Sequence, residues 1–211
     1  NICKKYKNVK IISTPAKISY VEKLNFILKK IKNGWILILD ADYILSNGAQ
    51  KEIQNFLLID NYGYQFKIFN KVLGRVIYKD LYPSKTLLFN VKNIKFKQDG
   101  HKEKILFYGK KKLLKSYIVH DDQKKFSLWF LNQIRYAKLE SRKIFLTKYK
   151  LLKREDKIRK IPFAMNIASF IYYYFYKGLY KFGLSGVYYV FQRQIYEFIL
   201  SIYIFYFLLL K

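Results

Sequence analysis

Two aspartates one residue apart directly follow an apolar run near the start of the chain. The run is Trp35-Ile36-Leu37-Ile38-Leu39, and Asp40-Ala41-Asp42 comes next. A continuous apolar run of this length predicts a buried strand of an α/β sheet, and ligands bind at the carboxyl ends of such strands. Carboxylates on alternate residues can turn toward one hard cation that bridges protein and phosphate. The motif therefore indicates a metal-bound nucleotide phosphate, and the alternative is a strand followed by an ordinary acidic turn.

The two histidines of the chain both lie beside acidic residues. His101 follows Asp99 and precedes Glu103, and His120 directly precedes Asp121. A lone histidine is more often a hydrogen-bonded core residue than a ligand, so that interpretation stays open. Histidine next to carboxylates is nevertheless typical of metal and catalytic sites, and together with the upstream aspartates the pattern favours a functional role.

Length and composition set the class of protein. A chain of 211 residues allows one domain, or one domain with an extension, and can bury a real core. Hydrophobic residues make up 52% and aromatic residues 19% of the chain, which excludes an intrinsically disordered protein. The single cysteine, Cys3, excludes a disulfide scaffold and a cysteine-based zinc site. The chain opens at Asn1 without a start methionine or a secretory leader, so we expect a fragment.

The formal net charge of +27 predicts an anionic partner. Lysine dominates over arginine and Ile, Asn, Tyr and Phe are abundant, which indicates codon bias as well as function. A positive field of this size attracts nucleotide phosphates, anionic lipid headgroups or nucleic acid. The lysines are spread along the whole chain, and no RRM, zinc-finger or KH signature is present. We therefore expect no nucleic-acid partner.

Residues 1–123 are expected to form an α/β unit. Short apolar or alternating runs predict strands, and helical spacing of apolar residues predicts helices. The expected strands are 9–12, 36–39, 64–69, 74–78, 86–89 and 118–120, and the expected helices are 20–31 and 49–59.

Two helical regions are expected to follow. Residues 124–161 predict a basic amphipathic helical region, and residues 162–211 form an apolar, aromatic tail. The uncharged runs in the tail, 163–176 and 198–210, are shorter than the about 20 residues that a transmembrane helix needs. Aromatic residues with neighbouring cations favour a helix pair lying in the membrane interface. The alternative is a buried helix pair of the core.

An ordered set of motifs runs through the chain. It comprises W-I-L-I-L-D-A-D, then G-R, then L-Y-P with L-F five residues on, then D-G-H, then I-V-H-D-D-Q-K and W-F-L-N-Q-I-R-Y-A-K-L-E. The set resembles the inverting glycosyltransferases of family 2, in the branch that builds lipopolysaccharide cores and related surface glycans. The resemblance covers most of residues 1–195.

The resemblance implies a GT-A fold, which is a Rossmann-like nucleotide-diphospho-sugar transferase core, followed by an amphipathic, membrane-interfacial helical region. It also implies a nucleotide-sugar donor, Mg²⁺ or Mn²⁺, and a glycolipid or lipid-linked acceptor. Family members begin with a strand and a D-S-x-S-x-D-like turn, whereas this chain begins at a point past that turn. The chain also departs from the family at Tyr43, where an acid is common, and at Gln123, where the family motif has arginine.

Site residues can be carried over from the family position by position. Asp40 and Asp42 match the D-x-D motif, which holds the metal and, with Ala41, reaches the donor ribose and diphosphate. Lys23 and Asn25 match a K-x-N stretch ahead of this motif, which implies a place in donor binding.

The remaining motifs imply the catalytic and acceptor residues. His120 matches a histidine that can approach the metal or the diphosphate. Asp99 lies where the family has its catalytic carboxylate, and Glu103 is the alternative base. The acceptor and diphosphate region is expected to comprise Gly100, His101, Asp121, Asp122, Lys124, Trp129, Gln133 and Arg135.

These features together predict a glycosyltransferase attached to the cytoplasmic face of the inner (plasma) membrane as a peripheral or monotopic protein. Inverting transfer is one in-line displacement at the anomeric carbon, so it needs a base for the acceptor hydroxyl and positive charge for the departing diphosphate. The alternative is a non-catalytic basic protein that binds the membrane surface with a degenerate transferase fold. Convergence of Asp40, Asp42, Asp99 and His120 in space would favour the enzyme.

Overall fold

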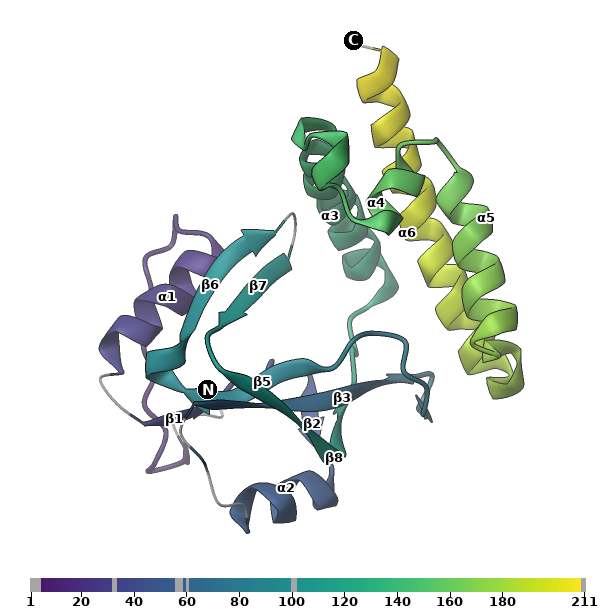
Figure 1. The fold of residues 1–211 in the computed structure, drawn as a ribbon. Helices are drawn as coiled ribbons and strands as arrows, with labels where there is room; N and C mark the ends of the chain where they lie inside the picture. The colour runs from purple at the N-terminus through teal and green to yellow at the C-terminus, as the bar shows by residue number, and fades with distance from the viewer. Residues whose placement is uncertain (1–4, 32–33, 56–58, 60, 100–101, 210–211) are drawn as a thin grey trace.

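The computed structural model describes residues 5–31, 34–55, 59, 61–99 and 102–209. Within these ranges the chain is a mixed α/β structure in which a curled sheet and a long hairpin lie beside a helical layer (Figure 1). The sheet and hairpin come from the first 120 residues, and the helical layer comes from the rest.

The α/β unit contains two helices and eight strands among the described residues. The helices are α1 (Tyr20–Lys30) and α2 (Asn47–Gln54), and a 3₁₀ turn, η2, covers Val91–Asn93. The strands are β1 (Trp35–Leu37), β2 (Tyr43–Leu45), β3 (Tyr62–Val72), β4 (Arg75–Ile77), β5 (Lys85–Asn90), β6 (Ile94–Asp99), β7 (Lys102–Phe107) and β8 (Lys110–His120).

Local sequence explains why α1 begins where it does. The Ser19 hydroxyl accepts the backbone N–H of Glu22, and the Glu22 carboxylate accepts the backbone N–H of Ser19. This reciprocal capping box satisfies donors that the first turn leaves free. The expected helix over 20–31 is confirmed, whereas the expected helix over 49–59 begins two residues earlier and ends at Gln54.

The main sheet has the order β1-β5-β3-β8-β2, with β4 paired to β3. β3 and β8 run parallel, and the other neighbours pair antiparallel. A core of Tyr64, Phe66, Leu114 and Ile118 packs on the side of the sheet that α2 covers. The other side packs Phe89 against α1 and the β6–β7 hairpin.

Two of the sequence predictions about strands are wrong. The run 35–39 was expected to be a buried strand, but β1 is an edge strand and its residues are half buried. The reason is that β5 is its one partner in the described part of the chain. Residues 9–12 form no strand, and Ile11 is 53% exposed, because no neighbouring strand in the described ranges pairs with them.

The helical layer consists of α3 (Phe126–Leu146), α4 (Arg154–Arg159), α5 (Ala164–Phe170) and α6 (Leu184–Leu209). Three shorter helical turns join them, namely η3 (Tyr149–Leu151), η4 (Ile171–Tyr176), which is a π-helix, and η5 (Leu179–Phe182). The basic region expected over 124–161 is therefore helical, but it breaks between α3 and α4. Among the described residues we find no helix with the length and hydropathy that crossing a bilayer requires.

α6 is the element that joins the layer together. One stretch of it, Tyr196, Leu200 and Ile204, packs on Ala137 and Ile144 of α3. An earlier stretch, with Tyr189 and Val190, packs with Leu179 of η5 against Val72, Ile77 and Leu81 at the end of the sheet. Gly186 lies so close to the Leu179 carbonyl group that no Cβ fits there. The tail predicted over 162–211 therefore contributes to the core along one face.

A buried carboxylate, Glu197, holds the helices of this layer in place. Its side chain has no solvent exposure and accepts hydrogen bonds from Arg159 at 2.9 and 2.6 Å and from Arg193 at 3.3 Å. Arg159 also donates to Asp156 at 2.8 Å. Burial lowers the pKa of Arg159, but the hydrogen bonds that Arg159 donates to Glu197 outweigh it and raise the pKa above its usual value. Buried charges need such partners because an isolated charge is costly to remove from water.

We predict that Glu197→Gln lowers the free energy of unfolding by about 3 to 5 kcal/mol, because it leaves the two arginine charges buried without their main partner. Urea unfolding followed by circular dichroism measures this loss. The control is Asp80→Asn, which breaks the exposed Lys67–Asp80 ion pair and should cost at most about 1 kcal/mol. A Glu197→Gln loss no larger than that of the control would contradict the role given to this carboxylate.

Candidate functional site

The Asp40-Ala41-Asp42 segment crosses from one edge of the main sheet to the other. It lies between β1 at one edge and β2 at the opposite edge. The backbone N–H of Ile38 donates to the Leu87 carbonyl oxygen of β5 at 2.9 Å, and that of Asp121 donates to the Asp42 carbonyl oxygen at 2.8 Å. These two hydrogen bonds hold the crossing segment against β5 and against the residue that follows β8. The sheet topology therefore brings Asp42 beside the residues that follow β8.

His120 and Asp42 form the contact at the centre of the site. His120 Nε2 lies 3.4 Å from Asp42 Oδ2, and His120 Nδ1 lies 3.0 Å from the side-chain oxygen of Asn70. His120 is the last residue of β8 and is in register with Asn70 on β3 and Tyr43 on β2. The Tyr43 ring packs edge-on against the imidazole at 5.6 Å. Sequence reasoning missed Asn70, which carries no motif and is found only through strand register.

The Asn70 contact sets which nitrogen of His120 carries the proton. The Asn70 oxygen can only accept, so Nδ1–H donates to it and the Nε2 lone pair of the neutral ring is left facing Asp42. Two acceptor atoms 3.4 Å apart can share a proton, or can both bind a cation that lies to one side of the line joining them. A hydrogen bond on the far nitrogen of a metal-binding histidine commonly orients the ring in this way.

Lysines neutralise the acidic residues that follow β8. Lys124 lies 2.8 Å from Asp122 and 3.5 Å from Asp42, and Lys71 lies 2.9 Å from Asp121. Burial lowers the pKa of Lys124, but the hydrogen bond to Asp122 and the nearby carboxylates outweigh it and raise the pKa. The hydrogen bond from Lys71 lowers the pKa of Asp121. The segment therefore presents both an ammonium group and carboxylates next to Asp42.

A second group of side chains surrounds Asp40. The Tyr20 hydroxyl donates to Asp40 at 3.3 Å. Burial, followed by the charges of Asp40 and Glu103, raises the pKa of Tyr20 to about 12. Lys85 donates to the Tyr43 hydroxyl at 3.1 Å and lies 4.0 Å from Glu103. Tyr20 and Lys85 carried no signal in the sequence, because tyrosine and lysine are among its most abundant residues.

The β6–β7 hairpin separates the two carboxylates considered as the base. Gln98 pairs with Glu103 and Asp99 pairs with Lys102, so the side chains of Asp99 and Glu103 point to opposite faces of the hairpin. Glu103 is on the side of Lys85 and Tyr20. Asp99 instead pairs with Lys143 of α3 at 2.9 Å and with Lys153 at 3.1 Å.

The lysine pairing makes Asp99 a poor base. Burial raises its pKa, but the hydrogen bonds from Lys143 and Lys153 outweigh burial and hold the pKa below its usual range. A carboxylate stabilised in this way binds a proton weakly. The expectation that Asp99 shares a site with Asp40, Asp42 and His120 therefore stays a prediction, and its contacts connect it to the helical layer instead.

The other expected site residues have local partners. Asn25 pairs with the backbone of Phe96 through both polar atoms of its amide, which fixes α1 to β6. Lys23, two residues earlier, is half buried. On α3, Gln133 donates to the carbonyl oxygen of Trp129, and the exposed Arg135 lies over the Tyr136 ring. Ala41 is exposed in the turn between the two aspartates. Gly100 and His101 lie outside the described residues.

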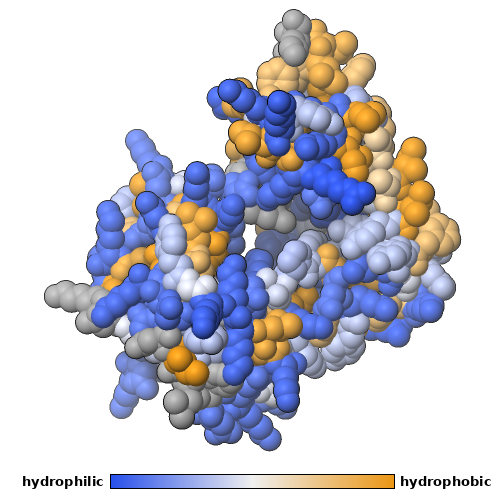
Figure 2. All heavy atoms as spheres, in the orientation of Figure 1, coloured by the Kyte–Doolittle hydropathy of each residue, from blue (hydrophilic) through white to orange (hydrophobic). Residues whose placement is uncertain are grey.

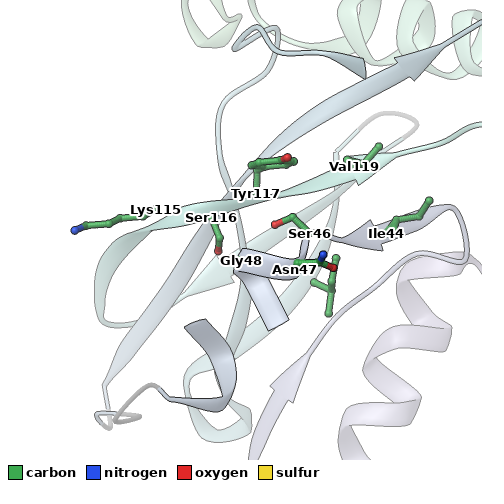
Figure 3. A pocket seen from close by; sticks show the side chains of 9 residues that line it. Ile44, Ser46, Asn47, Gly48, Lys115, Ser116, Tyr117 and Val119 are labelled. Carbon is green, nitrogen blue, oxygen red and sulfur yellow. The ribbon is translucent and has the colours of Figure 1, made fainter. Parts of the chain in front are cut away.

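A pocket of about 410 Å³ lies elsewhere, where β2, the start of α2 and β8 meet (Figure 3). Its wall includes Ile44, Ser46, Lys115, Tyr117 and Val119. Neither Asp42 nor His120 is among the residues that line it. The pocket is therefore separate from the Asp42–His120 contact.

Asp42 and His120 fit a metal ion whose remaining ligands come from water and a bound molecule, rather than an ion enclosed by protein side chains alone. Within the described ranges, no group of three or more His, Cys, Asp or Glu side chains could hold a metal ion. Asp42 and His120 supply two ligands that face one point. Mg²⁺ is commonly held by one or two protein carboxylates, and water and substrate phosphates complete its coordination. Mn²⁺ also prefers oxygen ligands, so an imidazole is a weaker ligand for it than a carboxylate is. The two residues therefore fit a cation that a diphosphate completes.

Comparison with known proteins identified no family for this chain. The chain matches no protein-family model. It also matches no curated protein sequence. What the site can do therefore follows from its own residues.

We predict that the neutral form of His120 carries its proton on Nδ1, because Asn70 accepts from that nitrogen. Imidazole ¹⁵N chemical shifts at alkaline pH measure this, and His101→Gln leaves His120 as the one histidine to assign. Asn70→Asp keeps an acceptor and should preserve the tautomer, whereas Asn70→Ala should lose the preference. A proton on Nε2 in the unsubstituted chain would show that the Asn70 amide is oriented the other way.

Proposed function

We propose that this protein is a glycosyltransferase that moves a sugar from a nucleotide-sugar donor to a glycolipid or surface-polysaccharide acceptor. The observation that supports it most is the 3.4 Å contact between Asp42 and His120, two residues 78 positions apart in the sequence. Lys124 adds positive charge at the same carboxylate. Sites of this chemistry bind a diphosphate through a cation and a lysine.

The proposal includes the family and fold suggested by the ordered motifs. In this view, residues 1–123 correspond to a GT-A core of the family 2 inverting transferases. The short connection from β1 to Asp40 and Asp42 supports it, because the D-x-D motif follows a strand in that fold.

Asp42, His120, Lys124 and Asp40 each have a separate role in binding the donor and its diphosphate. Asp42 and His120 would hold Mg²⁺ or Mn²⁺, which neutralises charge on the departing diphosphate. Lys124 adds a fixed ammonium group beside Asp42. Asp40, oriented by the Tyr20 hydroxyl, is placed to accept hydrogen bonds from donor hydroxyl groups.

Glu103 is the base that the geometry favours. It takes the proton of the acceptor hydroxyl, the oxygen attacks the anomeric carbon, and the bond from that carbon to the diphosphate oxygen breaks on the opposite side. The Lys85 ammonium group lies 4.0 Å from the Glu103 carboxylate, on the side of the hairpin that faces Tyr20 and Asp40. Asp99, held by two lysines, is the alternative base and otherwise anchors the hairpin to α3.

A non-catalytic function is the second candidate. The observation that favours it is that both aspartates of the motif already have partners, Lys124 for Asp42 and Tyr20 for Asp40. In such a protein these contacts would be permanent, and the basic surface would bind anionic membranes without binding a nucleotide. Direct binding of a nucleotide distinguishes the two functions.

We predict that the protein binds a nucleoside diphosphate only when Mn²⁺ or Mg²⁺ is present. Isothermal titration calorimetry with uridine, guanosine and cytidine diphosphates measures this. Asp42→Asn should weaken binding by about 10- to 100-fold, because it removes a ligand of the cation. The matched control is Asp80→Asn, which removes the exposed ion pair with Lys67 of β3 and should leave the affinity for the nucleotide unchanged. Absence of binding to all three nucleotides, with or without metal, would favour the non-catalytic function.

We predict that Glu103→Gln lowers the rate of sugar transfer, or of transfer to water, by about 10²- to 10⁴-fold while donor affinity stays within a few fold. Release of nucleoside diphosphate from a panel of nucleotide sugars measures the rate. Asp99→Asn should lower the melting temperature, because it releases Lys143 and Lys153, and should reduce the rate less than Glu103→Gln does. The reverse order of rate losses would assign the base to Asp99.

A further inference from the structure

α6 directs its charged residues inward and its apolar residues outward. Arg193 and Glu197 are its two charged residues, and their side chains are 21% and 0% exposed. The side chains of Phe191, Ile202 and Phe205 are about half exposed on the outer surface. A helix that faces water has the opposite distribution, with charge outside and apolar residues inside.

The outward apolar surface continues onto the preceding helices. Ile167 of α5 and Ile171 and Phe175 of η4 are exposed, and the surface lies along α5 and α6 in the space-filling view (Figure 2). Residues 161–176 contain no charged residue, and in 182–209 Arg193 and Glu197 are turned inward. We call this surface, formed by the exposed side chains of 161–176 and 182–209, the apolar face. A contiguous apolar surface of this kind marks an interaction site, whereas single exposed apolar residues do not.

Cations lie at one end of the apolar face, where the chain turns back between η4 and α6. Lys177 lies over the Tyr172 ring at 5.4 Å, and Lys181 lies over the Tyr180 ring at 5.7 Å. Tyrosine and lysine side chains of this kind are typical of the boundary between hydrocarbon and lipid headgroups, because each has an apolar stem and a polar tip. The end of the face therefore matches the chemistry of a headgroup layer.

We propose that the apolar face inserts into one leaflet of an anionic membrane, with α6 lying in the plane of the interface. Positive charge on the chain is complementary to anionic headgroups, each nearby cation contributing about 1 kcal/mol. A second copy of the chain would carry the same net charge of +27 and would be repelled. The inward ion pairs of Arg193 and Glu197 are then kept away from lipid, as charged residues in membranes are.

This inference deepens the proposed function and rests on it for the identity of the acceptor. η5 and α6 pack on the end of the sheet, and Arg75 of β4 donates to the Phe182 carbonyl oxygen. Asn70, which contacts His120, is on β3 and pairs in register with Ile77 of β4. A leaflet that held the apolar face would thus set the distance of the candidate site from the lipid surface, where a lipid-linked acceptor is found.

The test uses sedimentation of the full chain with vesicles of phosphatidylglycerol and phosphatidylethanolamine, at low salt and at 1 M NaCl. The variant is Phe191→Gln with Ile202→Gln and Phe205→Gln, all on the apolar face. The matched control is Ile11→Gln with Tyr108→Gln and Leu113→Gln, which are equally exposed on the α/β unit. We expect the first variant to lose more than about tenfold of its salt-resistant affinity, and the control to keep it. Equal salt-resistant binding by both variants would overturn the proposal.

A fluorescent label distinguishes insertion from adsorption by charge. In a Cys3→Ser background, Ile202→Cys and Leu113→Cys each provide one labelling site. An environment-sensitive dye should shift to the blue on vesicle addition at position 202 and not at position 113. Lack of a shift at position 202 would contradict membrane insertion. A dimer observed without lipid by sedimentation equilibrium would also contradict it, if the substitutions at Phe191, Ile202 and Phe205 dissociate that dimer. Because neither measurement contains a nucleotide, failure here leaves the nucleotide-binding test of the proposed function unaffected.

Discussion

The buried ion pairs that begin at Glu197 determine how the two halves of the molecule meet. Glu197 of α6 binds Arg159, Arg159 binds Asp156, and Asp156 lies 3.6 Å from Lys143 of α3. Lys143 in turn pairs with Asp99 at the tip of the β6–β7 hairpin. Removing one member leaves charge buried without a partner, which is why such a chain of contacts allows one arrangement of the helices and few others.

The same ion pairs explain the assignment of roles on the hairpin. Adjacent strand residues point to opposite faces, so a hairpin whose Asp99 faces Lys143 must direct Glu103 the other way, toward Lys85. One carboxylate therefore serves to join the hairpin to the helical layer, and the other is free of that task. The inward turn of Arg193 and Glu197 has a second consequence, because it leaves the opposite side of α6 to Phe, Ile and Leu.

The candidate site depends on a sheet whose first and last strands are connected directly. The segment from Ile38 to Asp42 runs from β1 to β2 past the three strands between them, and its backbone is fixed near β5 and β8. This path brings Asp42 to His120, whose ring is oriented by Asn70 from the neighbouring strand. The site thus combines three strands, and no local stretch of sequence contains it. A shift of β8 by one residue against β3 would turn His120 to the other face.

Sequence alone determined the parts of this protein that local chemistry controls. Apolar spacing identified α1, and the alternation along 64–69 identified β3. The acidic and histidine motifs pointed to Asp42 and His120, which the fold brings together.

Tertiary structure decided what depends on partners far away in the chain. Strand pairing placed β1 at the edge of the sheet, because an apolar run records how hydrophobic a strand is and not how many neighbours it has. Strand pairing also revealed Asn70, and a long-range hydrogen bond revealed Tyr20; neither residue type carries a signal outside these contacts. Long-range ion pairs gave Asp99 and Glu103 different partners, Lys143 for Asp99 and Lys85 for Glu103. The ion pair between Arg159 and Glu197 determined which face of α6 is buried. Periodicity predicts that a helix has two faces, but only packing decides which one meets the core.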